Sequence, residues 1–341
     1  MQASLSLIRY LLAALLLWSL PLAAQDDTYI AADLVAEGRP EPGKTLAVAL
    51  RFRPDAGWHG YWSNPGEAGL GMVLEWRLPE GWEAGEPQYP VPEVLTLFGI
   101  VNHSYESDYT VLVPIFVPEQ AAVQNIAPIT VDARWLACSD ELCVPEQATL
   151  TLRIPASADA VRADFDAARA AIPPLIDRKA RYAYTDTHLR LAIPLPEGLD
   201  LAAPHVFVET LDTVDYAGEQ GFYRNGNTVI AAIPRGSLRS EPDALSGILA
   251  FGEGGEGVRF EAVPGEVPTG GSRLGGAMAD TSLPLLLGAA LLGGLILNLM
   301  PCVFPILSLK ALTLARAGES EAQARSEGLA YTAGVMLACI A

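Results

Sequence analysis

Two cysteines in a polar stretch of the chain are its clearest candidates for chemistry. Cys138 and Cys143 are separated by four residues, a spacing that lets two sulfur atoms bridge across a tight turn. A redox-active disulfide, a structural disulfide and part of a metal site all fit such a pair. Closing so short a ring stabilises a fold by only about 2 kcal/mol, and the four histidines show no ligand spacing to the pair. The pattern therefore favours redox chemistry and leaves the other two possibilities open.

The residues around the pair are acidic. Asp140, Glu141 and Glu146 are close in sequence, and no lysine or histidine is. Negative neighbours oppose formation of a thiolate. We expect these thiols to react slowly until a partner disulfide is bound, as suits a selective electron donor.

A third cysteine lies within an apolar segment. Residues 281–309 carry no charge and are numerous enough to cross a bilayer. Within them, Pro301 and Pro305 flank Cys302, and each proline must interrupt the helix. Interrupted helices are tolerated in lipid where they line a cavity. We expect Cys302 to be a redox centre in such a cavity; the alternative is a buried cysteine beside an ordinary kink.

Composition and targeting signals point to an exported membrane protein. The net charge of −18 excludes a nucleic-acid binder, which needs a basic face. Residues 1–24 have the form of a signal peptide, with Arg9 before an apolar run and small residues at a cleavage site after Ala24. The apolar segment 328–341, which holds Cys339 as an expected packing residue, is too short to span. We expect the chain to be a fragment of a larger membrane protein or a truncated gene model.

The strand pattern predicts a mainly β exported region of two immunoglobulin-like β-sandwich domains, followed by the start of an α-helical transmembrane domain. Short alternating segments with Pro- and Gly-rich turns lie on both sides of an Ala-rich helical stretch at 156–172. Residues 183–193 are expected to form one strand, and Asn225-Gly226 a hairpin turn. The predicted segments are a signal peptide (1–24), a first β-sandwich with the redox pair (25–155), a helical linker (156–180), a second β-sandwich (181–265), a linker (266–280), and one full and one truncated transmembrane helix (281–341).

Several motifs together resemble one family. The segment Asn298–Lys310, Asn-Leu-Met-Pro-Cys-Val-Phe-Pro-Ile-Leu-Ser-Leu-Lys, is similar to the first transmembrane helix of the DsbD/ScsB thiol:disulfide interchange proteins, whose membrane part is cytochrome c biogenesis-like. Gly57–Gly66, Leu97–Gly99 and the Cys138…Cys143 pair occur in the order of that family's N-terminal domain. The two-domain exported region is more similar to the ScsB branch, the copper-sensitivity suppressors.

The resemblance implies a protein-disulfide reductase that needs no cofactor and no metal. Cytoplasmic thioredoxin would reduce membrane cysteines, which pass electrons to a thioredoxin-like domain, then to the exported pair, and finally to exported disulfide proteins of cytochrome c maturation or copper tolerance. Cys138 and Cys143 match the exported pair and Cys302 the first membrane cysteine, whose partner lies beyond this chain. The resemblance also implies a multi-pass protein of the bacterial inner membrane, in contact with the lipid bilayer, with residues 25–280 in the periplasm.

The family resemblance and the sequence also suggest roles for individual residues of the first exported domain. By analogy with the family, Cys143 is expected to attack the partner disulfide. Phe98, in the loop Leu97–Gly99, is expected either to cap the pair or recognise a partner, or else to anchor its loop. Trp58, Tyr61 and Trp62 are expected to pack the sandwich, with partner recognition as the alternative.

Two other functions fit the sequence. One is an exported immunoglobulin-like binding or adaptor module, tethered to the membrane and held by a structural disulfide. The other is a copper-handling protein, although the chain has no Met- or His-rich tract.

The assignment of the membrane cysteine can be tested in the full-length protein. Cys302→Ser should abolish reduction of the Cys138–Cys143 pair in cells and leave expression and insertion unchanged, because the relay loses its membrane thiol. Cys339→Ser is the matched control and should keep the pair reduced. Thiol trapping of the exported pair measures both. A reduced pair in Cys302→Ser, or an oxidised pair in Cys339→Ser, would show the assignment to be wrong.

Overall fold

The structure is a computed structural model, and it describes residues 28–123, 127–155, 157–237, 241–252, 255–274, 287–288 and 290–294. The chain divides into one compact unit up to Gly275 and a second from Gly276 to Ala341. The predicted signal peptide, Cys302 with its prolines, and Cys339 lie outside the described residues. Among the helices of the part described, none has the length and apolar character to span a bilayer.

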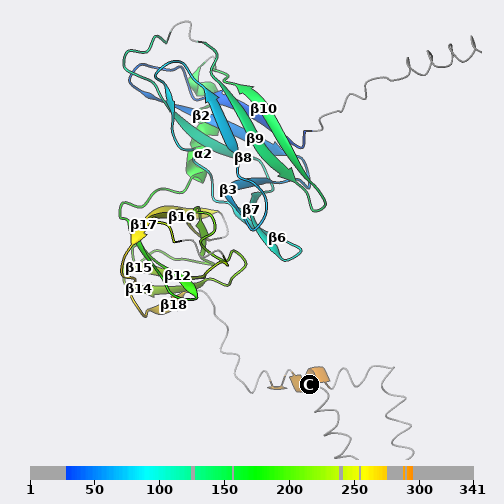
Figure 1. Ribbon diagram of the computed structural model, residues 1–341, viewed down its shortest axis with the longest axis vertical. Coiled ribbons are helices and arrows are strands. Elements are labelled where there is room, and N and C mark those ends of the chain that lie inside the picture. Colours follow the sequence, from blue (N-terminus) through cyan, green and yellow to red (C-terminus); the bar gives the residue numbers. More distant parts are fainter. Residues whose placement is uncertain are drawn as a thin grey trace, which may run out of the picture. The chain divides into compact units, whose positions relative to one another are not determined.

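The first unit begins with a β-sandwich of ten strands (Figure 1). Its strands form three sheets, in the orders β1-β2-β8-β5, β10-β9-β4 and β3-β7-β6. The strands are β1 (Ile30–Ala36), β2 (Thr45–Pro54), β3 (Gly60–Gly66), β4 (Val73–Arg77), β5 (Glu83–Ala84), β6 (Glu93–Leu97), β7 (Ile100–Tyr105), β8 (Tyr109–Phe116), β9 (Thr130–Cys138) and β10 (Cys143–Thr151).

The core of this sandwich follows from alternation along the strands. Since successive side chains of a strand point to opposite faces, every second residue of β2 and β8 faces inward. Leu50 is paired with Val111, and both are fully buried. The alternate residues Val131, Ala133 and Trp135 of β9 are buried in the same cluster. The predicted mainly β, immunoglobulin-like sandwich is therefore present in the described residues.

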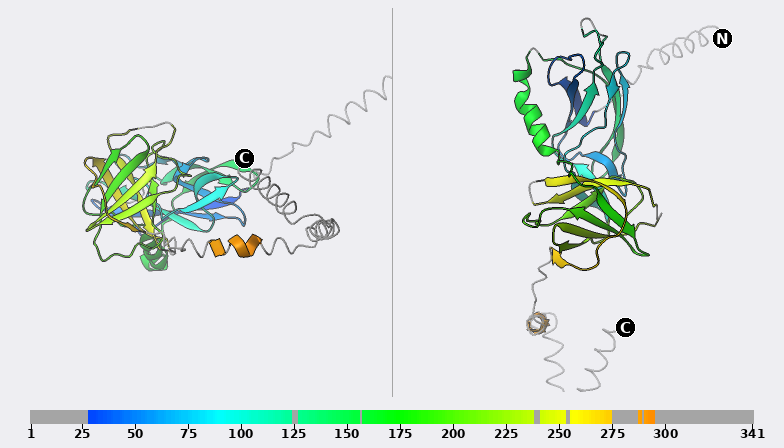
Figure 2. Two further views of the ribbon diagram at one scale, coloured as in Figure 1. Left: turned by 90° about the horizontal axis from the view of Figure 1, so that it is seen from below. Right: turned by 90° about the vertical axis from the view of Figure 1, so that its left-hand side faces the viewer.

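A helix covers the outer face of the β1-β2-β8-β5 sheet. After a single 3-10 turn (Ala158–Ala160), α2 runs from Arg162 to Ala171, inside the predicted helical stretch. Its buried Phe165 and Ala168 pack on Ala49 and Leu112, which alternate with the core residues of their strands. Figure 2 shows α2 lying along the side of this sandwich. An exposed sheet face thus becomes a second, smaller apolar cluster.

The later part of the unit is one antiparallel-rich sheet of eight strands, in the order β13-β16-β17-β11-β12-β15-β14-β18. Residues from β13 at one edge and from β14 near the other share one buried cluster, so the sheet curves around its own core. The strands are β11 (Ala180–Tyr184), β12 (His188–Pro194), β13 (His205–Val208), β14 (Gly221–Asn225), β15 (Thr228–Pro234), β16 (Leu245–Phe251), β17 (Glu256–Pro264) and β18 (Ser272–Leu274).

One predicted strand of this part is wrong, and one predicted turn is confirmed. Residues 183–193 do not form one strand, because Thr185 donates its backbone N–H to the carbonyl of His188 and reverses the chain between β11 and β12. The Asn225-Gly226 turn joins β14 to β15, with Gly226 at φ +53°. That backbone conformation is one which glycine adopts without strain.

A buried contact joins this sheet to β3 of the first sandwich. The amide of Asn64, which is fully buried, donates to the carbonyl of Val208 at 2.7 Å and to the Tyr216 hydroxyl at 3.0 Å. The rings of Trp62 and Phe207 meet edge to face beside it. The later sheet therefore braces β3, which carries Tyr61 and Trp62 and directly follows Trp58 and His59.

A buried carboxylate fixes the start of β1 to the cysteine-bearing hairpin. Glu146 on β10 accepts hydrogen bonds from the backbone N–H groups of Tyr29 and Ile30 and, at 2.7 Å, from the Trp135 indole. Only 8% of Glu146 is exposed. Hydrogen bonds to charged groups are among the stronger ones in proteins, so this carboxylate is a strong polar link between the start of β1 and β10, which are edge strands of two different sheets.

Glu146→Ala should lower the free energy of unfolding of residues 25–275 by about 3 kcal/mol, because three N–H donors lose their acceptor. Urea denaturation, followed by tryptophan fluorescence, measures this change. Glu80→Ala, at an exposed glutamate, is the control and should stay within about 0.5 kcal/mol of the wild type. Equal stability of the two variants would contradict the role given to Glu146.

Candidate redox site

The two exported cysteines end paired strands and lie directly opposite each other. Cys138 is the last residue of β9 and Cys143 the first of β10, and the register pairs them. Their sulfur atoms form a disulfide, with 4.1 Å between the Cα atoms. Cys138 is 1% exposed, whereas Cys143 is an exposed residue. An incoming thiol or disulfide can therefore reach Cys143 first.

A short turn holds the pair in place. Ser139 donates its backbone N–H to the Leu142 carbonyl at 2.8 Å. Its hydroxyl accepts the N–H groups of Glu141 and Leu142 at 3.3 and 3.2 Å. Serine favours such local side-chain to backbone bonds in turns. The four residues between the cysteines thus form an ordered hairpin turn with the charged Asp140 and Glu141 side chains at the surface.

The structure brings a histidine to the pair that the sequence placed far away. His59 and Cys138 exchange two backbone hydrogen bonds, His59 N–H to the Cys138 carbonyl at 2.8 Å and Cys138 N–H to the His59 carbonyl at 3.1 Å. Residues paired in this way have side chains on the same face, with Cβ atoms about 5 Å apart. His59 is buried, and Nε2 of its ring lies 3.3 Å from the Tyr61 hydroxyl.

Burial decides the charge of this histidine. Loss of solvent lowers the pKa of His59, and the nearby carboxylates of Glu106 and Asp140 oppose that change by a smaller amount. Burial likewise raises the pKa of Tyr61. Both side chains are neutral at pH 7, so a polar and uncharged pair lies beside the buried cysteine.

The environment of the thiols is less acidic than the sequence predicted. Glu146 is three residues from Cys143 on the same strand, so its side chain is on the opposite face. There its carboxylate accepts hydrogen bonds from the Trp135 indole and from the backbone at the start of β1. Of the three predicted acidic neighbours, only Asp140 and Glu141 belong to the cysteine turn.

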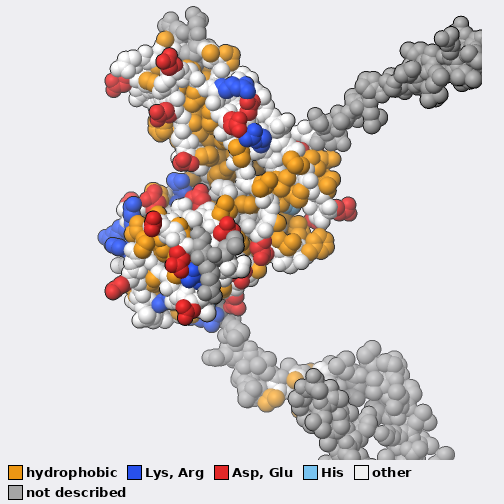
Figure 3. Space-filling view, viewed as in Figure 1, with side chains coloured by type: hydrophobic (Ala, Val, Ile, Leu, Met, Phe, Trp, Pro, Cys, Tyr) orange, Lys and Arg blue, Asp and Glu red, His pale blue; other side chains and the backbone are white. Residues whose placement is uncertain are grey.

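Phe98 lies at the tip of the β6–β7 hairpin and is 92% exposed, with a positive φ of 53°. Its ring therefore shields no other group in this structure. Val94 and Ile100 on the same hairpin, and Leu142 on the cysteine turn, are also exposed apolar residues. Figure 3 shows apolar side chains gathered on this side of the first sandwich. The tryptophans behave differently: Trp62 is 2% exposed in the core, and Trp58 stacks on Tyr29.

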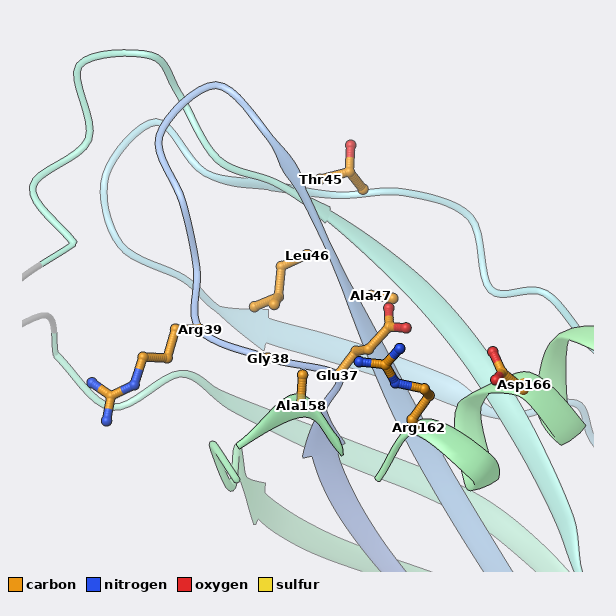
Figure 4. Close-up of a pocket in the computed structure, with 9 residues that line it drawn as sticks. All are labelled: Glu37, Gly38, Arg39, Thr45, Leu46, Ala47, Ala158, Arg162 and Asp166. Atoms are coloured by element: carbon orange, nitrogen blue, oxygen red, sulfur yellow. The ribbon is translucent and has the colours of Figure 1, made fainter. Parts of the chain in front are cut away.

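Two hollows on the first sandwich differ in their relation to the cysteines. One of about 980 Å³ runs along β1 and β10 and includes Leu136 and Pro145, which are two residues from Cys138 and Cys143 and share their face. Another of about 360 Å³ lies between β2 and the start of α2, lined by Glu37, Arg39 and Arg162 among others (Figure 4). No cysteine lines the second hollow. In the described part of the chain, no group of three or more His, Cys, Asp or Glu side chains is arranged to hold a metal ion.

His59 is a site residue that sequence analysis did not assign, and Tyr61 was expected to pack the sandwich or recognise a partner rather than to contact a histidine. The available signal was the segment Gly57–Gly66, which carries the family resemblance. Pairing between β3 and β9 is a long-range contact, and spacing along the chain does not reveal it.

The fold and the site together define a class of protein: a β-sandwich module that presents a cysteine pair, one residue buried and one exposed, on a surface hairpin. The comparisons agree with this class. Residues 27–155 match the family model described as "Thiol:disulfide interchange protein DsbD, N-terminal". This part of the chain is therefore similar to the N-terminal domain of the DsbD family, which agrees with the resemblance seen in the motifs.

One solved structure extends the likeness in fold beyond residues 27–155. The N-terminal periplasmic domain of ScsB from Proteus mirabilis is 15% identical, with a TM-score of 0.56, and the match covers 72% of this chain and 97% of that one. The N-terminal domain of Neisseria meningitidis DsbD in the reduced form is 16% identical, with a TM-score of 0.24, and the match covers 36% of this chain and 85% of that one. The comparison with curated proteins gave no match.

Reduction of the pair should lower the melting temperature of residues 25–275 by only a few degrees and leave the β-type circular dichroism spectrum unchanged. The reason is the small ring, whose closure contributes about 2 kcal/mol. Thermal melts with and without dithiothreitol measure the shift. The Cys138→Ala/Cys143→Ala variant should melt at one temperature in both conditions. Unfolding of the wild type on reduction would make the disulfide structural.

Proposed function

We propose that this protein is a thiol:disulfide reductase whose Cys138–Cys143 pair passes two electrons to disulfides of exported proteins. The observation that carries the proposal is the unequal exposure of the two cysteine residues in a domain of the DsbD type. A structural disulfide gains nothing from an exposed sulfur on a turn. A redox pair needs one sulfur that a partner can reach and one that is protected from it.

The two cysteines then have different roles. Cys143, exposed at the start of β10, attacks the partner disulfide and forms a mixed disulfide. Cys138, buried and fixed by its backbone bonds to His59, attacks Cys143 in turn and releases the reduced partner. The burial difference supports for this chain the order that the family analogy predicts.

Recognition of the partner is proposed to use the exposed apolar residues near the hairpin tips. Phe98, Ile100 and Leu142 are exposed to 92%, 44% and 54%. Aromatic and aliphatic anchors of this kind carry much of the energy of protein interfaces. Phe98 is therefore proposed as a recognition residue. A closing movement of the β6–β7 hairpin would be needed for it to cap the pair.

The source of the electrons is proposed from the family. Cytoplasmic thioredoxin would reduce a membrane pair that includes Cys302, in a helix interrupted at Pro301 and Pro305, and a thioredoxin-like domain would carry electrons to the exported pair. This scheme places residues 25–280 in the periplasm and the rest in the bacterial inner membrane, as a multi-pass protein. Proteins of cytochrome c maturation or copper tolerance are the proposed recipients.

The division of roles can be tested with residues 25–275, reduced and mixed with the aromatic disulfide DTNB. The wild type should release two equivalents of thionitrobenzoate and retain no adduct, because Cys138 displaces the group from Cys143. Cys138→Ser should release one equivalent and keep the adduct on Cys143. Cys143→Ser should react far more slowly, since its remaining sulfur is buried. Mass spectrometry identifies the adducts.

A wild type that keeps one or two adducts, or equal rates for the two single variants, would contradict the proposal. Such results would favour a tethered binding module with a structural disulfide.

A further inference from the structure

We propose that His59 is the proton acceptor that ionises the buried Cys138 thiol when Cys138 resolves the mixed disulfide on Cys143. This inference rests on the proposed reductase function and adds to it the group that handles the proton. It follows from the pairing of His59 with Cys138, from the burial of both residues, and from the hydroxyl that contacts the imidazole.

The backbone places the imidazole beside the sulfur. His59 and Cys138 are directly opposite in an antiparallel bridge with both hydrogen bonds formed, and their side chains share a face. They are 3% and 1% exposed, so bulk water has little access to either. A thiol buried in this way needs an internal base, because desolvation disfavours its thiolate.

The groups around His59 keep it able to accept a proton. Burial lowers its pKa, against smaller opposing effects of Glu106 after β7 and Asp140 in the cysteine turn. A neutral imidazole has one ring nitrogen free to accept. The Tyr61 hydroxyl lies 3.3 Å from Nε2 and holds the ring's orientation.

Tyr61 is itself held by the loop that follows β3. A Cβ atom on Gly69 would lie 2.4 Å from the Tyr61 ring, so this loop packs closely over the tyrosine. Gly69 also has a φ of +99°, which side-chain-bearing residues rarely adopt. The Tyr61 hydroxyl is thus held in a fixed position next to the His59 imidazole.

The exchange balances in two steps. The Cys143 thiolate attacks the partner disulfide, so a Cys143–partner bond forms, the partner S–S bond breaks, and one partner thiolate leaves. Cys138 then gives its proton to His59, and its thiolate attacks Cys143. The Cys138–Cys143 bond forms, the Cys143–partner bond breaks, and the departing thiolate takes the proton back from His59. Two electrons pass to the partner, and His59 ends neutral.

The test uses the full chain in detergent, with Cys302→Ser and Cys339→Ser in every arm so that only the exported pair reacts with DTNB. Stopped-flow absorbance separates the first release of thionitrobenzoate, by Cys143, from the second, by Cys138. At pH 7, His59→Gln should slow the second release at least about tenfold and leave the first unchanged. At pH 10 hydroxide ionises the Cys138 thiol directly, so the rate of the second release should be similar in His59→Gln and in the parent protein.

Matched variants separate chemistry from folding. His188→Gln, at a half-buried histidine of β12, should leave both releases unchanged. Tyr61→Phe removes only one hydroxyl and should slow the second release less than His59→Gln does, again with convergence at pH 10. It keeps the inference testable if His59→Gln fails to fold.

Three results would overturn the inference. One is a second release of thionitrobenzoate that is as fast in His59→Gln as in the parent protein at pH 7. If His59→Gln does not fold, a second release in Tyr61→Phe that is as fast as in the parent protein overturns the inference instead. Another is slowing by the same factor at pH 7 and pH 10, which indicates a structural role. The third is a parent protein that releases no second equivalent; it contradicts the reductase function itself, whereas the first two leave that function standing.

Discussion

The register between β9 and β10 is the constraint on which the site depends. Because side chains alternate along a strand, a slip of one residue would move a cysteine to the opposite face. In the observed register Cys138 faces Cys143 directly, and Glu146 pairs with Trp135 on the inner face. The same pairing therefore sets the redox pair outside and a buried polar anchor inside. The register of this one hairpin therefore positions both the redox pair and the polar anchor of the sandwich.

Contacts around the hairpin make the two cysteines unequal in their exposure to solvent. Strand pairing at His59 covers Cys138, whereas Cys143 begins β10, whose outer neighbours Pro145 and Gln147 are exposed. The later eight-stranded sheet contributes indirectly, since Asn64 and Trp62 tie β3 to Val208 and Phe207. This arrangement gives the second β part a physical role, which is to stiffen β3, the strand that carries Tyr61 and directly follows His59.

The sequence predicted those structural features that depend on interactions between neighbouring residues. The cysteine spacing, the helix near 156–172 and the Asn225-Gly226 turn depend on neighbouring residues alone, and all are present. The turn at Thr185–His188 was missed because it contains no glycine or proline to mark it. The bonds from Glu146 to the start of β1 and the position of His59 were missed because both join parts of the chain that are distant in sequence. Family resemblance pointed to the right segment without giving its geometry.

The central claim is that the exported disulfide exchanges electrons rather than holding the fold together. Equilibration of residues 25–275 with glutathione redox buffers, followed by alkylation and mass spectrometry of the Cys138–Cys143 peptide, gives its reduction potential directly. The account predicts a potential less negative than about −300 mV, the range of exchangeable rather than structural disulfides. A markedly more negative potential, with loss of the folded state on reduction, would contradict it.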